Sequence, residues 1–167
     1  SKASVNTINQ VDIYIGTLSK AVGSYGGYAC AKKIIIDFIV NRCRTQIYTT
    51  GLPPAVLAAS LKALDIISKK NCLFKIPINN ANYFCKKMNI KKTGTPIVPL
   101  IVNSESRALK ISNFLLKNGL LVSAIRPPTV PKNTSRLRLA FNSSHSKQQI
   151  DKLVSNLKKA LILYEEK

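Results

Sequence analysis

The segment RLRLAFN, residues 136–142, constrains the fold of this chain most strongly, because its polar and apolar side chains alternate strictly. Successive side chains of a strand point to opposite faces, so Arg136 and Arg138 share one face and Leu137 and Leu139 share the other. The preceding ten residues, RPPTVPKNTS, contain three prolines, which exclude regular secondary structure. We therefore predict a strand with one buried face, entered from a loop.

The rest of the second half supplies the elements that such a strand needs. TPIVPLIV and LLVSAI, residues 95–102 and 120–125, are apolar and predict two further strands. Residues 106–119 predict a helix that ends at a glycine, and the segment from residue 146 onward predicts an amphipathic helix. We expect this half to form a small α+β unit.

The first half is predicted to begin with two strands joined by a glycine-rich connection. VDIYIG, residues 11–16, predicts a buried strand, and YACA, residues 28–31, predicts a second strand. Residues 32–44 predict a helix, although their Ile/Val run is also compatible with a strand. Pro53 and Pro54 open a clear helix, because a proline is tolerated in a first helical turn. A further helical stretch, residues 79–88, is expected to follow a break at Pro77.

The chain is strongly basic, with 26 lysines and arginines against seven acidic residues and a formal net charge of +19. Such a charge ordinarily suggests nucleic acid or another anionic surface. The basic residues are scattered in pairs, and no aromatic stacking pattern accompanies them. We therefore do not expect specific nucleic-acid binding as the primary role.

The sequence disfavours a membrane span, a signal peptide and a zinc site. No apolar run reaches the ~18 residues of a membrane span, and the N-terminal residues lack the pattern of a signal peptide, so we expect a cytoplasmic protein. The single histidine and the wide cysteine spacings offer neither a C-x-x-C motif nor a zinc site, so no metal is expected. Reduced, buried thiols are the simplest interpretation of the four cysteines, Cys30, Cys43, Cys72 and Cys85.

Lys20 is the candidate nucleophile of the chain. A lysine amine attacks carbonyl groups when its pKa is lowered or when a cofactor holds it as a Schiff base. A strand end fixes such an amine, and the glycines that follow allow a bulky cofactor to approach the backbone. Thr17, three residues earlier, offers a hydroxyl to a phosphate group. A surface lysine in an ordinary loop remains the alternative.

GTLSKAVGSYGGY, residues 16–28, resembles the cofactor-lysine segment of the α-oxoamine synthases, pyridoxal-phosphate enzymes of fold type I in the class-II aminotransferase superfamily. Three later segments are similar to this family in the same order: IYTTGLPPAVLAASLKAL, TPIVPLIV followed by SRAL, and AIRPPTVPKNTSRLRLAFNSSHS. The resemblance implies an α/β fold, with the end of a large mixed-sheet domain over residues 1–90 and a small α+β domain over residues 91–167. It also implies an acyltransferase that binds pyridoxal 5'-phosphate.

The resemblance assigns cofactor roles residue by residue. Lys20 matches the lysine that bonds covalently to the cofactor and moves the proton on the substrate α-carbon. Thr17 matches the residue that hydrogen-bonds the cofactor phosphate. Tyr48 and Thr50 fall on the segment that, in the homodimer of the family, approaches the phosphate in the neighbouring subunit. The resemblance therefore implies a shared active site.

The substrate roles come from the second half of the chain. Thr129 matches a substrate-binding position, and Arg138 matches the arginine that pairs with the amino-acid carboxylate. A guanidinium on a rigid strand suits bidentate carboxylate recognition, although Arg136 and Arg138 taken alone are equally compatible with the solvent face of an edge strand. The proline loop most resembles the family member that condenses pimeloyl thioester with L-alanine in biotin biosynthesis. Another member of the family, or a non-catalytic basic interaction module, remains the alternative.

The chain departs from the family in the position of its lysine, which normally lies past the middle of the sequence. In relatives, the upstream half supplies the ring stacked on the cofactor, the aspartate paired with its pyridine nitrogen and most of the acyl pocket. Two interpretations follow. The chain is either one piece of an enzyme whose other piece is a separate polypeptide, or a decayed remnant of the enzyme with little activity. The sequence favours the second interpretation. Either implies an exposed sheet edge and uncovered faces in residues 1–70.

Overall fold

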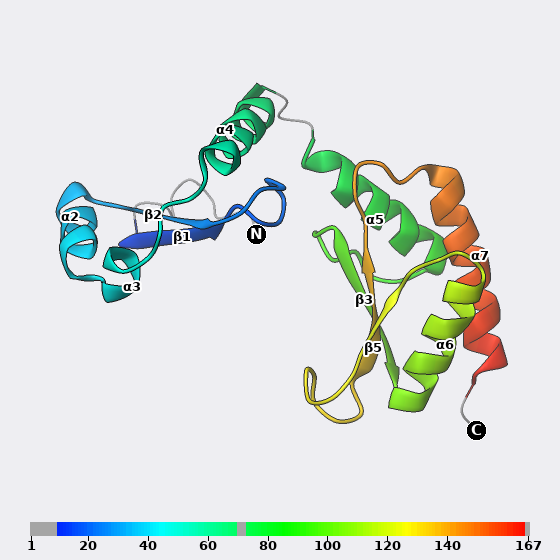
Figure 1. Cartoon of the computed structure of the whole chain (residues 1–167). Coiled ribbons are helices and arrows are strands. Elements are labelled where there is room, and N and C mark those ends of the chain that lie inside the picture. Colours follow the sequence, from blue (N-terminus) through cyan, green and yellow to red (C-terminus); the bar gives the residue numbers. More distant parts are fainter. Residues whose placement is uncertain (1–9, 70–72, 166–167) are drawn as a thin grey trace. The chain divides into compact units, whose positions relative to one another are not determined.

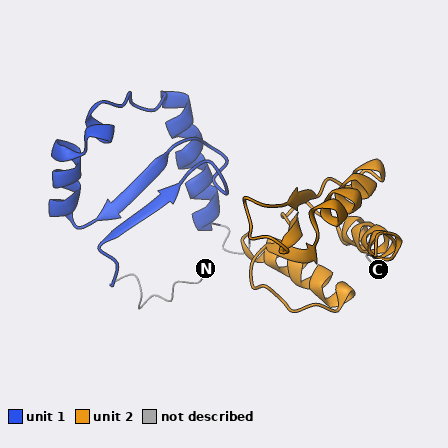
Figure 2. Cartoon of the chain, turned by 90° about the horizontal axis from the view of Figure 1, so that it is seen from below, with its two compact units in different colours: residues 1–71 blue, residues 72–167 orange. Residues whose placement is uncertain are grey.

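The computed structural model of the chain describes residues 10–69 and 73–165, and these form two compact units (Figure 2). Unit 1 spans residues 1–71 and unit 2 spans residues 72–167. The sequence predicts a domain boundary after residue 90, nineteen residues later than this division. The difference is one helix, α5 (Lys75–Met88), which packs against elements of the second unit.

Unit 2 is built on a three-stranded antiparallel sheet of β3 (Ile97–Asn103), β4 (Ser123–Ile125) and β5 (Ser135–Ala140). The strand order is β3-β5-β4, so the alternating segment forms the central strand and not an edge. Leu137 and Leu139 are buried as predicted, whereas Arg138 is exposed on the opposite face. One face of the sheet is therefore covered and the other is open.

The covered face is packed by three helices, α5, α6 (Glu105–Lys117) and α7 (Lys147–Leu163) (Figure 1). Helix α6 contacts all three strands and α7, while α5 contacts β3 and α7. The largest fully buried side chains include Phe84, Ile111, Leu115, Leu137, Ile150 and Leu157. The α+β unit expected for the second half is confirmed, and α5 belongs to its core.

Two predicted boundaries in unit 2 are wrong, the start of α5 and the start of β4. Helix α5 begins at Lys75, before the expected break at Pro77, because a proline in the first helical turn gives up an N–H that has no helical partner. Strand β4 begins only at Ser123, so residues 120–122 of the predicted strand lie outside the ladder with β5. The Val122 carbonyl accepts a hydrogen bond from the Ser112 hydroxyl of α6 at 2.6 Å.

The ends of α6 and α7 follow from their flanking residues. Ser104 accepts a hydrogen bond from the backbone N–H of Arg107, which satisfies one of the free donors at the start of α6. Gly119 follows the end of α6 with φ of +74°, a conformation that glycine adopts without strain. Ser146 and Gln149 form a capping box at the start of α7. Both helices expected in this half are therefore present, and the predicted glycine follows the end of the first.

Helices α5 and α7 are joined by a polar contact at the surface. The Tyr83 hydroxyl donates to both carboxylate oxygens of Asp151, at 3.0 and 3.1 Å, and the Lys87 ammonium lies 3.2 Å from Oδ1 of the same residue. The Tyr83 hydroxyl and the Lys87 ammonium lower the pKa of the Asp151 carboxyl below its ordinary value. The folded state therefore favours the ionised carboxylate.

The replacement Asp151→Asn is expected to make the stability of unit 2 less dependent on acidic pH. Because the folded pKa of Asp151 is lowered, its contribution is fully present above the unfolded pKa of about 3.9 and is lost as the pH falls through the folded value. Urea midpoints of both proteins at pH 7 and pH 2 measure this effect. The difference in urea midpoint between the unmodified protein and Asp151→Asn should be smaller at pH 2 than at pH 7. An equal difference at both pH values would contradict the lowered pKa of Asp151.

Unit 1 contains a two-stranded antiparallel sheet of β1 (Ile13–Thr17) and β2 (Gly27–Ala31), which confirms both predicted strands. Three helices follow it, and these are α2 (Lys33–Arg42), α3 (Arg44–Ile47) and α4 (Pro54–Lys69). The ambiguous segment 32–44 is thus mostly helical, and α4 begins at the proline pair as predicted. Among the described residues, no helix is both long and apolar enough to cross a membrane.

The apolar side chains of unit 1 are largely uncovered. Within residues 10–69, only Leu18 and Ser60 are buried, while Ile15 is 80% exposed and Ile34 is 76% exposed. The prediction that the first strand is buried is therefore wrong. Within residues 10–69, the main packing contacts of β1 are with β2, and its side chains are exposed on both faces. A sheet of two strands does not bury its own faces.

Candidate functional site

The loop that joins β1 to β2 places Lys20 at an exposed tip. The Leu18 N–H donates to the Gly26 carbonyl at 2.9 Å, and the Ser24 N–H donates to the Leu18 carbonyl at 2.9 Å. The Gly23 N–H closes a tight turn on the Lys20 carbonyl at 3.0 Å. Leu18 is buried, whereas the Lys20 side chain is open to solvent. The backbone of the loop is therefore fixed while the amine remains accessible.

Thr17 lies at the end of β1 and directs its hydroxyl into the same loop. Its Oγ1 accepts a hydrogen bond from the Ser19 N–H at 3.2 Å and lies 2.7 Å from the Ser19 hydroxyl. It also donates to the Gly26 carbonyl at 3.4 Å. These contacts place two exposed hydroxyls just before Lys20, where they could bind a phosphate oxygen.

The loop is anchored to α4 by two serines. The Ser24 hydroxyl donates to the Val56 carbonyl at 3.1 Å, and the Ser60 hydroxyl donates to the Ser24 hydroxyl at 2.8 Å. Gly26 lies against Leu52, since a Cβ atom on the glycine would come within 2.8 Å of a Leu52 methyl group. The lysine loop is therefore held by the first half of α4 as well as by its own hydrogen bonds.

The turn that carries Lys20 is open at Gly23, three residues after the lysine. A Cβ atom built on Gly23 would meet nothing within 4 Å, and this glycine adopts a φ of +65°. An accessible amine, two neighbouring hydroxyls and open space beside the turn fit the aldehyde and phosphate groups of pyridoxal phosphate. The residues present are therefore compatible with that cofactor.

The replacement Gly26→Ala is expected to loosen the lysine loop. Gly26 has a φ of +110°, where an L side chain costs ~1 kcal/mol or more, and its new methyl would also press on Leu52. Amide hydrogen exchange at Leu18 and Ser24 should become faster. Gly51→Ala is the matched control, because its Cβ would meet nothing within 4 Å and its φ is not positive. Equal exchange rates in both variants would refute this account of the loop.

Tyr48 and Thr50 lie between α3 and α4 in the same unit. Tyr48 follows α3 and is 78% exposed, with the Arg44 guanidinium 5.8 Å from its ring centroid. Thr50 is also exposed, and Leu52, two residues later, contacts the lysine loop through Gly26. This segment therefore ends beside the loop of Lys20, and the side chains of Tyr48 and Thr50 are exposed.

Thr129 and Arg138 both belong to unit 2. Thr129 is exposed in the loop between β4 and β5, where its N–H donates to the Arg126 carbonyl at 3.0 Å. Arg138 is exposed on the central strand, on the open face of the sheet, opposite Pro99 of β3 and Ser123 of β4. The four cofactor residues thus belong to one unit and the two substrate residues to the other.

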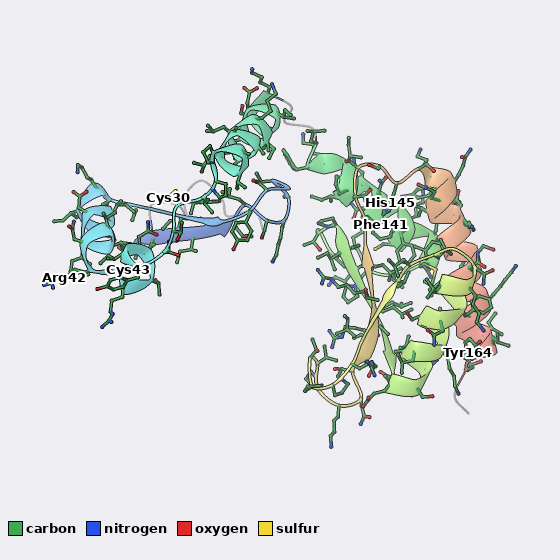
Figure 3. All side chains as sticks on the ribbon, viewed as in Figure 1. Cys30, Arg42, Cys43, Phe141, His145 and Tyr164 are labelled. Atoms are coloured by element: carbon green, nitrogen blue, oxygen red, sulfur yellow. The ribbon has the colours of Figure 1, made fainter. Side chains whose placement is uncertain are left out.

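The cysteines do not all follow the prediction of buried thiols. Cys85 is buried, and burial raises the pKa of its thiol. Cys30 is exposed, and Cys43 is only partly covered (Figure 3). The Thr45 hydroxyl, 3.1 Å from the Cys43 sulfur, lowers the pKa of the Cys43 thiol. Cys72 lies outside the described residues.

A cavity of about 350 Å³ in unit 2 contains none of the predicted site residues. Apolar side chains line most of it, together with His145, Gln149 and Lys152. The His145 Nδ1 atom accepts a hydrogen bond from the Asn142 N–H at 3.3 Å, and the histidine ring meets Phe141 edge-on (Figure 3). His145 therefore has a structural role in the turn that precedes α7.

The matched family and the fold agree on the class of protein. Residues 3–157 match the family described as aminotransferase class I and II, so the chain belongs to that family. Its fold is that of the C-terminal part of fold type I pyridoxal-phosphate enzymes. Serine palmitoyltransferase of Sphingomonas wittichii is similar over 95% of this chain and 42% of its own, with a TM-score of 0.88 at 22% identity. The predicted fold class is confirmed.

The particular proteins that it resembles are 8-amino-7-oxononanoate synthases. The enzyme of that name from Maricaulis maris is 47% identical over 149 residues, which are 89% of this chain and 38% of the relative. The solved structure of the Francisella tularensis 8-amino-7-oxononanoate synthase has a TM-score of 0.78 at 26% identity, over 91% of this chain and 46% of that one. The chain thus spans about 38% of the length of its curated relative.

Proposed function

We propose that this chain acts in a pyridoxal-phosphate-dependent acyltransferase of the 8-amino-7-oxononanoate synthase type, which condenses pimeloyl thioester with L-alanine and releases carbon dioxide. The observation that carries the proposal is the loop of Lys20, in which a hydrogen-bonded backbone presents an accessible amine beside two hydroxyls. The similarity to 8-amino-7-oxononanoate synthases over 89% of the chain supports the choice of reaction.

Four residues of unit 1 are proposed to serve the cofactor. When bound, pyridoxal phosphate supplies an electron sink for the α-carbon of the amino acid. Lys20 holds the cofactor and then accepts and returns the proton at that carbon, while the Thr17 hydroxyl binds a phosphate oxygen. Tyr48 and Thr50, exposed after α3, contact the cofactor phosphate held by a second copy of the chain. The active site is then shared between subunits.

Two residues of unit 2 are proposed to bind the amino acid. Arg138 lies on the central strand of a packed sheet, so its backbone is held in place. Its exposed guanidinium can therefore pair with the carboxylate in a defined geometry. Thr129 in the neighbouring loop offers a hydroxyl to the substrate.

The uncovered apolar side chains of unit 1 suggest a protein partner. Tyr14, Phe38, Tyr48 and Leu61 are all exposed, and exposed apolar groups of this size ordinarily mark contact surfaces. We propose either a second copy of the chain or a separate polypeptide equivalent to the rest of the relatives as the occupant. A cytoplasmic location and the absence of a specific nucleic-acid partner remain predictions.

The reaction is tested by supplying pyridoxal phosphate, carboxyl-labelled L-alanine and pimeloyl thioester. The chain is assayed alone and with a polypeptide comprising the part of the Maricaulis maris relative that this chain does not span. The proposal expects labelled carbon dioxide and 8-amino-7-oxononanoate in at least one mixture. Faster turnover of glycine with acetyl thioester, or of glycine with succinyl thioester, would instead assign a glycine C-acetyltransferase or a 5-aminolevulinate synthase. No turnover with any pair would refute the acyltransferase.

A further inference from the structure

We propose that Arg136 is a positioning residue for the amino-acid site, because it fixes the proline loop that carries Thr129 relative to Arg138. This inference rests on the proposed function. The Arg136 Nε–H donates to the Thr134 carbonyl at 2.9 Å, at the point where the loop enters β5. In the described part of the chain, this is the one hydrogen bond that a side chain from outside residues 126–134 makes to that loop.

The loop itself is closed into two short turns. The Thr129 N–H donates to the Arg126 carbonyl at 3.0 Å, which forms the first turn. The Thr134 N–H and hydroxyl both contact the Pro131 carbonyl, at 3.2 and 2.7 Å, which forms the second. The Arg136 side chain, which belongs to strand β5, donates to the residue that closes the second turn. Its hydrogen bond therefore fixes the hydrogen-bonded loop relative to the sheet. The loop projects beyond the strands of unit 2 in Figure 1, between β4 and β5.

Arg136 makes its hydrogen bond to Thr134 from a strand that is paired on both sides. It lies on the central strand, opposite Ile101 of β3 and Ile125 of β4, and it is half-buried whereas Arg138 is exposed. The two arginines share the open face of the sheet and lie about 7 Å apart along the strand. A movement of the loop away from Arg136 therefore changes the distance between Thr129 and the Arg138 guanidinium.

The same face has no carboxylate to neutralise the two arginines. In the described part of unit 2, the acidic residues are Glu105, Asp151 and Glu165, and all three lie on helices or after the last helix. The ion pairs of the described residues involve neither Arg136 nor Arg138. Arg136 thus contributes positive potential next to Arg138 in addition to its hydrogen bond, which favours an anionic ligand.

The test compares Arg136→Lys, which keeps the charge but removes the Nε–H donor, with Arg107→Lys as a matched control. Arg107 makes a similar hydrogen bond, from Nη2 to the Leu161 carbonyl at 3.3 Å, away from the sheet face. In the full chain, NMR follows amide exchange at Thr129 and Thr134 and the titration of the Thr129 signal with L-alanine. Alaninamide, which lacks the carboxylate, is titrated in parallel.

Arg136→Lys should speed exchange at both threonines about tenfold and weaken L-alanine binding about tenfold, whereas Arg107→Lys should change neither. Faster exchange with unchanged L-alanine binding would overturn the inference, because Arg136 would then stabilise the loop without positioning the site. If the unmodified chain bound L-alanine no better than alaninamide, the carboxylate site at Arg138 would itself be absent. That result would overturn both the proposed amino-acid site and this inference. It would be seen in the unmodified chain, whereas a failure of this inference alone would be seen only when Arg136→Lys is compared with the unmodified chain.

Discussion

The replacement Lys20→Arg is expected to abolish covalent binding of pyridoxal phosphate. Arginine keeps the positive charge at the tip of the lysine loop, but its guanidinium does not form a stable Schiff base with the cofactor aldehyde. The exposed tip lies in a turn closed by the Gly23 N–H, so the substitution should leave the fold of unit 1 unchanged. Visible absorbance of the protein after dialysis against cofactor-free buffer measures the bound cofactor.

Lys33→Arg is the matched control for this experiment. Lys33 is another exposed lysine of unit 1, 2.8 Å from Asp37, and it has no hydroxyl neighbour in the lysine loop. Lys33→Arg should retain the absorbance that Lys20→Arg loses. Equal retention by both variants would show that the cofactor reacts with surface lysines in general and would remove the assigned role of Lys20.

The replacement Phe84→Ala is expected to produce the largest loss of stability in unit 2. Phe84 is fully buried in α5, and its ring centroid lies 5.2 Å from that of Phe141 at the end of β5. Removing a buried phenylalanine ring costs about 3–5 kcal/mol, a large share of the ~5–15 kcal/mol that stabilises a typical domain. Urea unfolding of the full chain, followed by circular dichroism, should show this loss in the main cooperative transition.

Leu121→Ala is the control for the core substitution, because Leu121 is 86% exposed. It should change the free energy of unfolding by less than about 0.5 kcal/mol. If Phe84→Ala were equally mild, α5 would not belong to the core of unit 2. The division of the chain after residue 71 would then be incorrect as well.

The parts of the fold that the sequence predicts well are those whose pattern is local. The alternation of residues 136–142 forces one buried and one open face, and the structure has both. The helix expected over residues 106–119 is found as α6 (Glu105–Lys117), with the predicted glycine just after its end, because a helix end depends mainly on nearby backbone groups. The role of Lys20 stays a prediction, which rests on the family resemblance of its glycine-rich segment.

The parts that the sequence does not predict depend on contacts between distant segments. The apolar composition of residues 11–16 is compatible with burial, but the exposure of Ile15 depends on which elements cover the strand. The length of β4 depends on how far it pairs with β5, which is a separate segment of the chain. The contact of Arg136 with Thr134 was also missed, because alternation places Arg136 on a face without specifying which carbonyl it meets.

The covalent role of Lys20 is tested most directly by trapping the cofactor on the chain. The protein is incubated with pyridoxal phosphate, reduced with borohydride and digested, and the modified peptides are identified by mass spectrometry. The account predicts one dominant adduct, on Lys20, which is absent from Lys20→Arg. Adducts spread over the surface lysines, with no preference for Lys20, would contradict it.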